Sequence, residues 1–156
     1  SNRANLVRPG LVIYGQNPMG DSFPLDLKRT IRLKSRVTLV NELPAGHGIS
    51  YGRDFITSGP ARVATVGIGY ADGYPRQLSN TGAEVAIRGV RCPLVGRVTM
   101  DQIMVDGSAL DNVAPGDEVE LCGDTVSAGE VGGKAGAIVW DIFTGLGTRF
   151  SRRYIA

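Results

Sequence analysis

The segment Ile31–Leu43, "IRLKSRVTLVNEL", is the clearest indication of the fold class, because its apolar and polar residues alternate. The apolar residues that share one parity are Ile31, Leu33, Val37, Leu39 and Leu43. Successive side chains of a β-strand point to opposite faces, so a period of two buries one face and exposes the other. The stretch therefore predicts a half-buried strand rather than a helix.

Similar short apolar runs follow along the chain, and glycines separate them at intervals of roughly ten residues, a spacing typical of all-β domains. The runs are 61–69, 83–89, 90–96, 97–107, 115–123 and a closing run at 148–155. Gly89 lies between two of them and predicts a hairpin turn. The parity of the run 97–107 breaks near Asp101 and Gln102, which predicts a bulge or kink.

The period changes after residue 126. Ser127 and Glu130 have the spacing of a capping box, and helical spacing continues to about Gly145. Glycines interrupt this stretch, so we expect two short helices with a break near Gly136. The fold class is therefore mainly β, a barrel or folded sheet with a short helical insert near residues 127–145.

Residues 1–28 differ from the rest. The segment Val7–Gly15, "VRPGLVIYG", predicts a buried strand or turn, and the segment 16–28 is rich in Pro, Gly and Asp, like a linker. The chain begins without Met, so we expect it to be part of a longer protein. We divide it into a first part, residues 1–28, and a β domain, residues 29–156.

Composition narrows the function classes. The chain has 156 residues, the size of one ordinary domain, and a net charge of +2, too small to indicate a nucleic-acid partner. No apolar run reaches the roughly 18 residues of a membrane span, and no signal peptide is evident. Cys92 and Cys122 lack metal-ligand spacing and are expected to be free, buried thiols of a cytoplasmic protein. His47, the only histidine, is expected in an exposed turn, so no His-based metal or Ser/His site is predicted.

Four ordered blocks and a tail carry a resemblance to a known family. They read "RANLVRPGLVIYG", "ISYGRDF", "VGIGYADGYPRQLSN", "PLVGRVTMDQIMVD" and "GLGTRFSRRY". Together they resemble the C-terminal part of alanine racemase, a fold-type III enzyme that uses pyridoxal 5'-phosphate (PLP). The resemblance implies an N-terminal α/β barrel that holds PLP, a C-terminal β domain, and a head-to-tail homodimer. Residues 1–28 are then the end of that barrel and a linker.

The resemblance places the catalytic tyrosine at Tyr51. Racemisation removes a proton from one face of the substrate Cα and delivers another to the opposite face, so it needs two opposed groups. One is a lysine of the barrel, and the other is this tyrosine, contributed to the partner subunit. A tyrosine has a reference pKa near 10, so a base of this kind needs nearby positive charge or strong hydrogen bonds.

The resemblance also implies cofactor contacts. Arg8 faces the pyridine nitrogen of PLP, where a permanent cation discourages protonation of that nitrogen. Backbone N–H groups at Gly10 and Leu11 contact the phosphate. Trp140 stands where the family usually has a tyrosine whose hydroxyl holds the phosphate. An indole donates one N–H and accepts nothing, so the phosphate contact differs here.

The remaining implied roles concern the substrate and its route to the site. The backbone at Met100 meets the substrate carboxylate, and Tyr70 lines an inner gate. Arg76 and Arg97 lie further out along the same corridor, and Asp101 orients neighbouring groups at the kink. The substrate would be L- or D-alanine, in a pathway that supplies D-alanine for peptidoglycan.

Three other interpretations remain. The substrate range could include serine or be broader still. In another class, the domain could be a non-catalytic β-barrel that binds single-stranded nucleic acid, but its strands lack interleaved aromatic and basic residues. The chain could also be a relative with a degraded site, which Trp140 alone supports. Because Lys28, Lys34 and Lys134 lack the context of the family's lysine, we expect the chain alone to be inactive.

Overall fold

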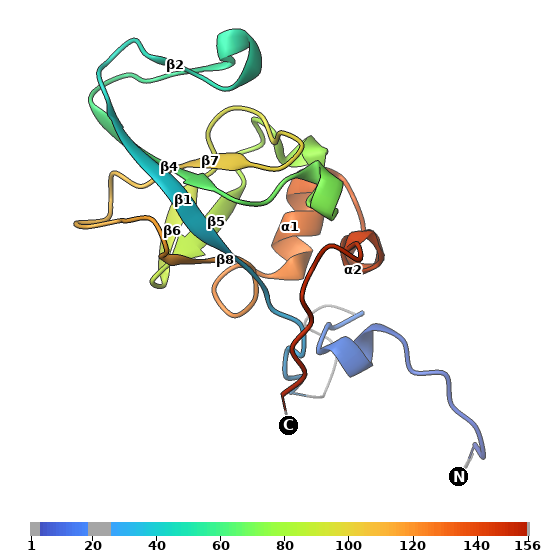
Figure 1. The fold of residues 1–156 in the computed structure, drawn as a ribbon. Coiled ribbons are helices and arrows are strands. Elements are labelled where there is room, and N and C mark those ends of the chain that lie inside the picture. The colour runs from blue at the N-terminus through green and yellow to red at the C-terminus, as the bar shows by residue number, and fades with distance from the viewer. Residues whose placement is uncertain (1–3, 19–25, 156) are drawn as a thin grey trace.

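One long strand organises the structure, a computed structural model that describes residues 4–18 and 26–155. The strands of the main sheet are β1 (Leu33–Leu43), β4 (Ala61–Val66), β5 (Glu84–Ile87), β6 (Val90–Pro93), β7 (Ile103–Asp106) and β8 (Glu118–Cys122). They form an antiparallel sheet in the order β6-β5-β8-β1-β4-β7 (Figure 1). A bridge between Leu94 and Val105 joins its two ends, and the Val95 N–H donates to the Met104 carbonyl at 2.9 Å. The nearly closed sheet confirms the predicted fold class.

The strand β1 pairs with β8 through its first half and with β4 through its second half. Leu33 and Val37 are buried, as the alternation predicts, but Leu39 is 51% exposed. The register with β4 shifts between Val37 and Leu39, and such an irregularity reverses which face the next side chains occupy. The alternation in this strand therefore holds only up to the shift.

The core lies between the curved sheet and the helical insert. Its fully buried members include Val85, Ile87, Ile103, Val119 and Leu121. A second, smaller cluster lies beneath a hairpin of two short strands, β2 (Gly48–Ile49) and β3 (Phe55–Ile56). Its buried members are Ile49, Val63 and Val95. This small cluster anchors the hairpin to the main sheet.

The helical insert matches its prediction. The helix α1 (Ala128–Ala135) begins at a capping box in which Ser127 and Glu130 satisfy each other's backbone N–H groups. It ends at Gly136, which has φ 66°, and α2 (Val139–Gly145) follows. The expected hairpin turn at Gly89 is also present, with φ 79°.

Two predicted strand segments are wrong. Residues 97–102 do not pair as a strand; Thr99 instead bonds to the Gln102 carbonyl through both its N–H and its hydroxyl, and β7 begins only at Ile103. The closing run 148–155 is irregular, because its arginines bind loops and carbonyl groups instead. The edge strands β6 and β7 already meet each other, so they leave little room for another strand.

The segment Val7–Gly15, for which the sequence predicts a strand or a turn, contains a turn and no strand. Leu11–Tyr14 form a 3-10 helix, η1, that ends at Gly15 with φ 70°. Leu11 is buried, and the Tyr14 ring lies 5.5 Å from the Phe143 ring of α2. Residues 19–25 of the expected linker lie outside the described residues.

Three smaller expectations concern single side chains and membrane spans. Cys92 and Cys122 are buried and free, and His47 is exposed, which confirms both predictions. Within the described ranges, no helix has the length and hydropathy to cross a membrane.

Candidate active site

Tyr51 lies at the tip of the β2–β3 hairpin, in a 3-10 turn, η3 (Tyr51–Arg53). Ser50, Gly52 and Arg53 all have positive φ, between 54° and 75°, and the Arg53 N–H donates to the Ser50 carbonyl at 3.1 Å. This sharp reversal directs Tyr51 away from the domain, and the side chain is 73% exposed. The hairpin extends from the body of the molecule (Figure 1).

Arg97 holds this turn from the loop that follows β6. Asp54, directly after the turn, accepts from Arg97 Nε and, at 3.0 Å, from Arg97 Nη2. A guanidinium–carboxylate pair with two bonds is a geometrically specific contact. The hydrogen bond from Arg97 holds the pKa of the Asp54 carboxyl below its usual value, and the same bond raises the pKa of Arg97.

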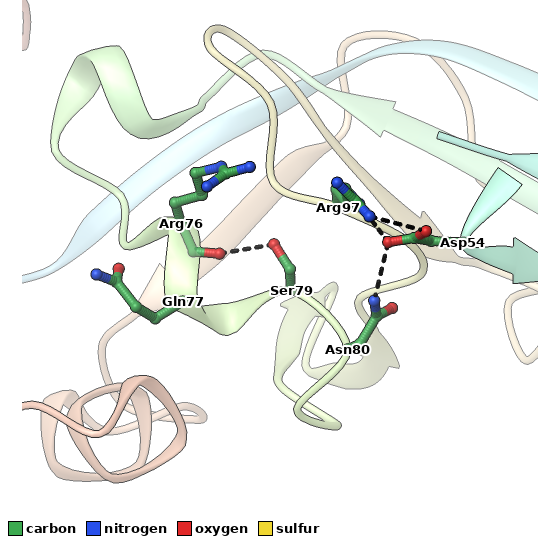
Figure 2. Close-up of a pocket in the computed structure, with 6 residues that line it drawn as sticks. All are labelled: Asp54, Arg76, Gln77, Ser79, Asn80 and Arg97. Atoms are coloured by element: carbon green, nitrogen blue, oxygen red, sulfur yellow. Dashed lines mark hydrogen bonds and ion pairs between the residues drawn. The ribbon is translucent and has the colours of Figure 1, made fainter. Parts of the chain in front are cut away.

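A cavity of about 330 Å³ opens beside this ion pair (Figure 2). It is lined by Asp54, Arg76, Gln77, Ser79, Asn80 and Arg97. Arg76 begins a second 3-10 turn, η5 (Arg76–Leu78), and Asn80 donates weakly to Asp54 at 3.4 Å. The structure thus brings together Arg76 and Arg97, which the sequence analysis assigned to one corridor.

Tyr70 and Met100 lie on two loops that are joined through their backbones. Tyr70 begins the turn η4 (Tyr70–Asp72), and its N–H donates to the Thr99 carbonyl at 2.9 Å. The Ala71 N–H donates to the Met100 carbonyl, also at 2.9 Å. Both side chains are partly exposed, Tyr70 by 41% and Met100 by 54%. The backbone of Met100 is therefore fixed by the Tyr70 loop.

Asp101 takes part in a second charged group. Arg149, in the irregular tail, pairs with Asp101 at 3.0 Å and with Asp72 at 3.3 Å. Asp72 also accepts from the Gly69 N–H at 2.9 Å. Arg149 thus joins the two loops that carry Tyr70 and Met100.

Arg149 and Asp54 were missed by the sequence analysis. Each reaches its partner across at least 40 positions of sequence, and no local spacing signals such a contact. The sequence analysis named their partners, Arg97 and Asp101. A search for residues of opposite charge to these two could have pointed to Asp54 and Arg149.

Gly10, Leu11 and Trp140 form a separate group. A Cβ atom added to Gly10 would lie 3.0 Å from Cη2 of Trp140, so the backbone passes directly over the indole edge. Trp140 is 40% exposed, and Arg8 is exposed two positions before Gly10. Figure 1 shows α2, which carries Trp140, well away from the hairpin of Tyr51.

The two groups differ in what they can do chemically. The first N–H groups of a 3-10 turn have no acceptor within the turn, so the start of η1 beside Trp140 can receive an anion such as a phosphate. The hairpin offers a phenol and a cavity with two guanidinium groups. Among residues 4–18 and 26–155, no cluster of three or more His, Cys, Asp or Glu side chains could hold a metal ion.

The fold and the site define a class: a nearly closed β domain that presents its functional side chains from surface loops. The chain belongs to the alanine racemase C-terminal domain family, whose model, described as "Alanine racemase, C-terminal domain", matches residues 30–154.

Curated relatives and solved structures agree with this assignment. The chain is 46% identical to the alanine racemase of Hahella chejuensis and 43% identical to that of Halothermothrix orenii. The matches cover 96% of this chain but only 40% and 41% of those relatives. The alanine racemase of Bartonella henselae, solved with covalently bound pyridoxal phosphate, superposes with a TM-score of 0.89 at 39% identity, over 95% of this chain and 41% of that one. The biosynthetic alanine racemase of Pseudomonas aeruginosa gives the same TM-score at 37% identity, over 96% and 42%. The chain thus spans about two fifths of the length of the relatives it matches.

Proposed function

We propose that this chain forms the C-terminal part of a PLP-dependent alanine racemase, which interconverts L-alanine and D-alanine. The observation that carries the proposal is the exposed Tyr51, aimed outward from a strained turn that Ser50 and Asp54 hold against Arg97. A core tyrosine would be buried, as Tyr74 is at 2% exposure. An exposed phenol on a braced turn suits a group that reacts outside its own domain.

The proposed site is shared between two subunits of a homodimer. The β2–β3 hairpin, which carries Tyr51, and α2, which carries Trp140, lie on separate parts of the domain (Figure 1), so one bound substrate is not expected to touch both residues in the same chain. Residues 1–28 would belong to the end of the cofactor-binding barrel and a linker, and residues 29–156 would form the β domain. The length of the relatives leaves room for that barrel.

The residues present fit PLP. When bound, PLP serves as the electron sink that makes the substrate Cα proton removable. Gly10 and Leu11 would give backbone N–H groups to its phosphate, and the indole N–H of Trp140 could add a donor. The close passage of Gly10 over Trp140 supports this arrangement, since only glycine fits there without displacing the ring. Arg8 would face the pyridine nitrogen as a permanent cation.

Tyr51 would move the proton on one face of the substrate. The Met100 backbone, fixed by the Tyr70 loop, would meet the carboxylate, and Tyr70 would line the inner gate. Arg76 and Arg97 would attract the anionic end of the amino acid through the cavity they share. Asp101, paired with Arg149, would keep the Met100 loop in place. The enzyme would work in the cytoplasm and supply D-alanine for peptidoglycan.

The chain by itself is expected to be inactive, because none of its three lysines, Lys28, Lys34 and Lys134, stands in the sequence context of the family's lysine. Lys34 pairs with Glu118 at 2.5 Å, and Lys134 donates to the Thr81 carbonyl at 3.3 Å. Neither lies in the Tyr51 turn or beside Trp140. The second acid–base group would come from the barrel.

The test is Tyr51→Phe in the full-length enzyme. Removing the hydroxyl abolishes proton transfer on one face, so racemisation should fall by about 10²–10⁴-fold, the usual contribution of a general acid–base group. Deuterium incorporation from solvent should survive for the alanine enantiomer whose proton the lysine removes, and should be lost for the other. An equal loss for both enantiomers, or near-normal racemisation, would remove Tyr51 from the mechanism.

A further inference from the structure

The backbone of the Tyr51 turn is strained. Ser50 and Arg53 are not glycines, yet they have φ of 68° and 54°. A non-glycine residue in such a region costs roughly 1–3 kcal/mol and persists only where the surroundings hold it. The contacts that hold this turn therefore determine where Tyr51 points.

One such contact precedes Tyr51. The Ser50 hydroxyl accepts from the Arg97 N–H at 3.1 Å and donates to the Arg97 carbonyl at 3.3 Å. Gly96 lies directly against Ser50, since a Cβ added to Gly96 would come within 2.7 Å of the Ser50 Cβ. The residue before Tyr51 is thus fixed to the backbone of a loop that is 47 positions away in sequence.

The other contact follows Tyr51. Asp54 binds the Arg97 side chain through two bonds and receives a third, weaker bond from Asn80 (Figure 2). The Asp54 side chain is 23% exposed and the Arg97 side chain 42% exposed. Ser50 holds the main chain of Arg97 and Asp54 holds its side chain, so one residue secures the turn on both sides of Tyr51.

We infer that Ser50 and Asp54, closing on Gly96–Arg97, form a clamp that aims Tyr51, and that Asp54 is a positioning residue for proton transfer. The inference rests on the proposed function of Tyr51. It gives Arg97 a task besides lining the corridor: its guanidinium holds the carboxylate that ends the turn.

The solvent exposure of the Asp54–Arg97 pair determines whether its loss changes the stability of the domain or only the geometry of the turn. An ion pair that solvent reaches contributes little to the global stability of a domain. The same pair can decide the geometry of a strained turn of four residues. Loss of Asp54 should therefore affect the placement of Tyr51 far more than it affects unfolding.

The experiment compares Asp54→Ala with Asp124→Ala in the full-length enzyme. Asp124 is the control for loss of a carboxylate that pairs with an arginine, because it pairs with Arg32 at 2.8 Å away from the hairpin; its side chain is more exposed than that of Asp54, at 61%. Asp54→Ala should slow deuterium exchange at the Cα of the enantiomer that depends on Tyr51 by about 10–100-fold, the effect of a displacement of about 1 Å. Exchange of the other enantiomer should stay within about twofold, and Asp124→Ala should change neither.

A double variant tests whether Asp54 acts by positioning Tyr51 or by lining the corridor. In a Tyr51→Phe background, Asp54→Ala should have no further effect on the remaining exchange, because Asp54 acts through Tyr51. Asp54→Asn, which keeps an oxygen for Arg97, should recover part of the loss. Equal slowing of both enantiomers, or a further loss in the Tyr51→Phe background, would overturn the inference and assign Asp54 to the corridor.

Amide hydrogen exchange of residues 48–56 gives a readout that does not need catalysis. It should rise in Asp54→Ala and stay unchanged in Asp124→Ala, and an unchanged rate in Asp54→Ala would overturn the clamp. If the wild-type enzyme exchanged neither enantiomer of alanine, the proposed function would fail, and the amide measurement would still decide whether the clamp exists.

Discussion

Gly69 lies where the loop that carries Tyr70 packs closely against the loop that carries Met100. A Cβ atom at this position would overlap the carbonyl oxygens of both Thr99 and Met100, and neither can swing away because both belong to the main chain. Those oxygens accept the N–H groups of Tyr70 and Ala71. The two loops can therefore approach this closely only because residue 69 is a glycine, which has no Cβ atom.

Gly69→Ala should destabilise the protein by about 2–4 kcal/mol, because the main chain must move and the two loops must separate. Gly59→Ala is the control, since nothing lies within 4 Å of its added Cβ and its φ is outside the left-handed region. Urea unfolding of the two variants checks the prediction. Equal urea midpoints for Gly69→Ala and Gly59→Ala would show that the two loops can separate with little loss of stability.

Single residues were predictable from sequence only where a motif marks them. Tyr51 stands in a short, recognisable block, and its exposure follows from the turn around it. Asp54 and Arg149 stand in no such pattern, because their importance comes from partners that the fold brings from distant loops. Long-range ion pairs leave no periodic trace in a sequence.

The helix α1 contains two neighbouring glycines in opposite environments. Gly133 is exposed with nothing within 4 Å of an added Cβ, whereas a Cβ on the buried Gly132 would lie 2.9 Å from the Ala137 carbonyl oxygen. Gly133→Ala should stabilise the protein by about 0.5–1 kcal/mol through reduced backbone entropy. Gly132→Ala should destabilise it, because the chain reversal after α1 would have to open. Thermal unfolding of both variants tests this, and a shift of the same sign in both would contradict it.

The start of the same helix makes stability depend on pH. Hydrogen bonds from Arg91 and from the Ser127 N–H lower the pKa of Glu130 from 4.5 to about 2. A lowered carboxyl pKa stabilises the fold fully above the unfolded value near 4.5, and this contribution is lost as the pH falls toward 2. Because Glu130 is about half exposed, we expect a contribution of about 1 kcal/mol.

Glu130→Gln provides the measurement. The wild-type protein should be the more stable of the two at pH 6, and the difference in free energy of unfolding should shrink as the pH falls below 4.5. A difference that stayed constant from pH 6 to pH 3 would show that the charge of Glu130 plays no part.

The predictability of the elements follows the same physics. The capping box and the hairpin at Gly89 are local, so sequence spacing predicted them correctly. The run 148–155 has strand-like composition but becomes irregular, because pairing needs a free sheet edge and β6 and β7 already meet. The shift in β1 that exposes Leu39 likewise depends on pairing with β4.

In the whole molecule, one domain carries two separate sets of candidate site residues. The β2–β3 hairpin, which carries Tyr51, lies well away from α2, which carries Trp140 (Figure 1). If both sets act in racemisation, each chain serves two sites: its own through Trp140 and its partner's through Tyr51. An activity measurement on mixed dimers can test whether the site is shared between two chains.

The test mixes equal amounts of two enzymes with greatly reduced racemase activity, one with Tyr51→Phe and one without the barrel lysine, and lets their subunits exchange. A mixed dimer then contains one site with an intact lysine and an intact Tyr51, and one site that lacks both. Random pairing makes half of the dimers mixed, so the mixture should regain roughly a quarter of wild-type activity. If each site is built within one chain, every site keeps its defect and the mixture stays inactive. A mixture of Tyr51→Phe with Asp54→Ala, Tyr51→Phe is the control, because both parents lack the same phenol and no pairing can restore it.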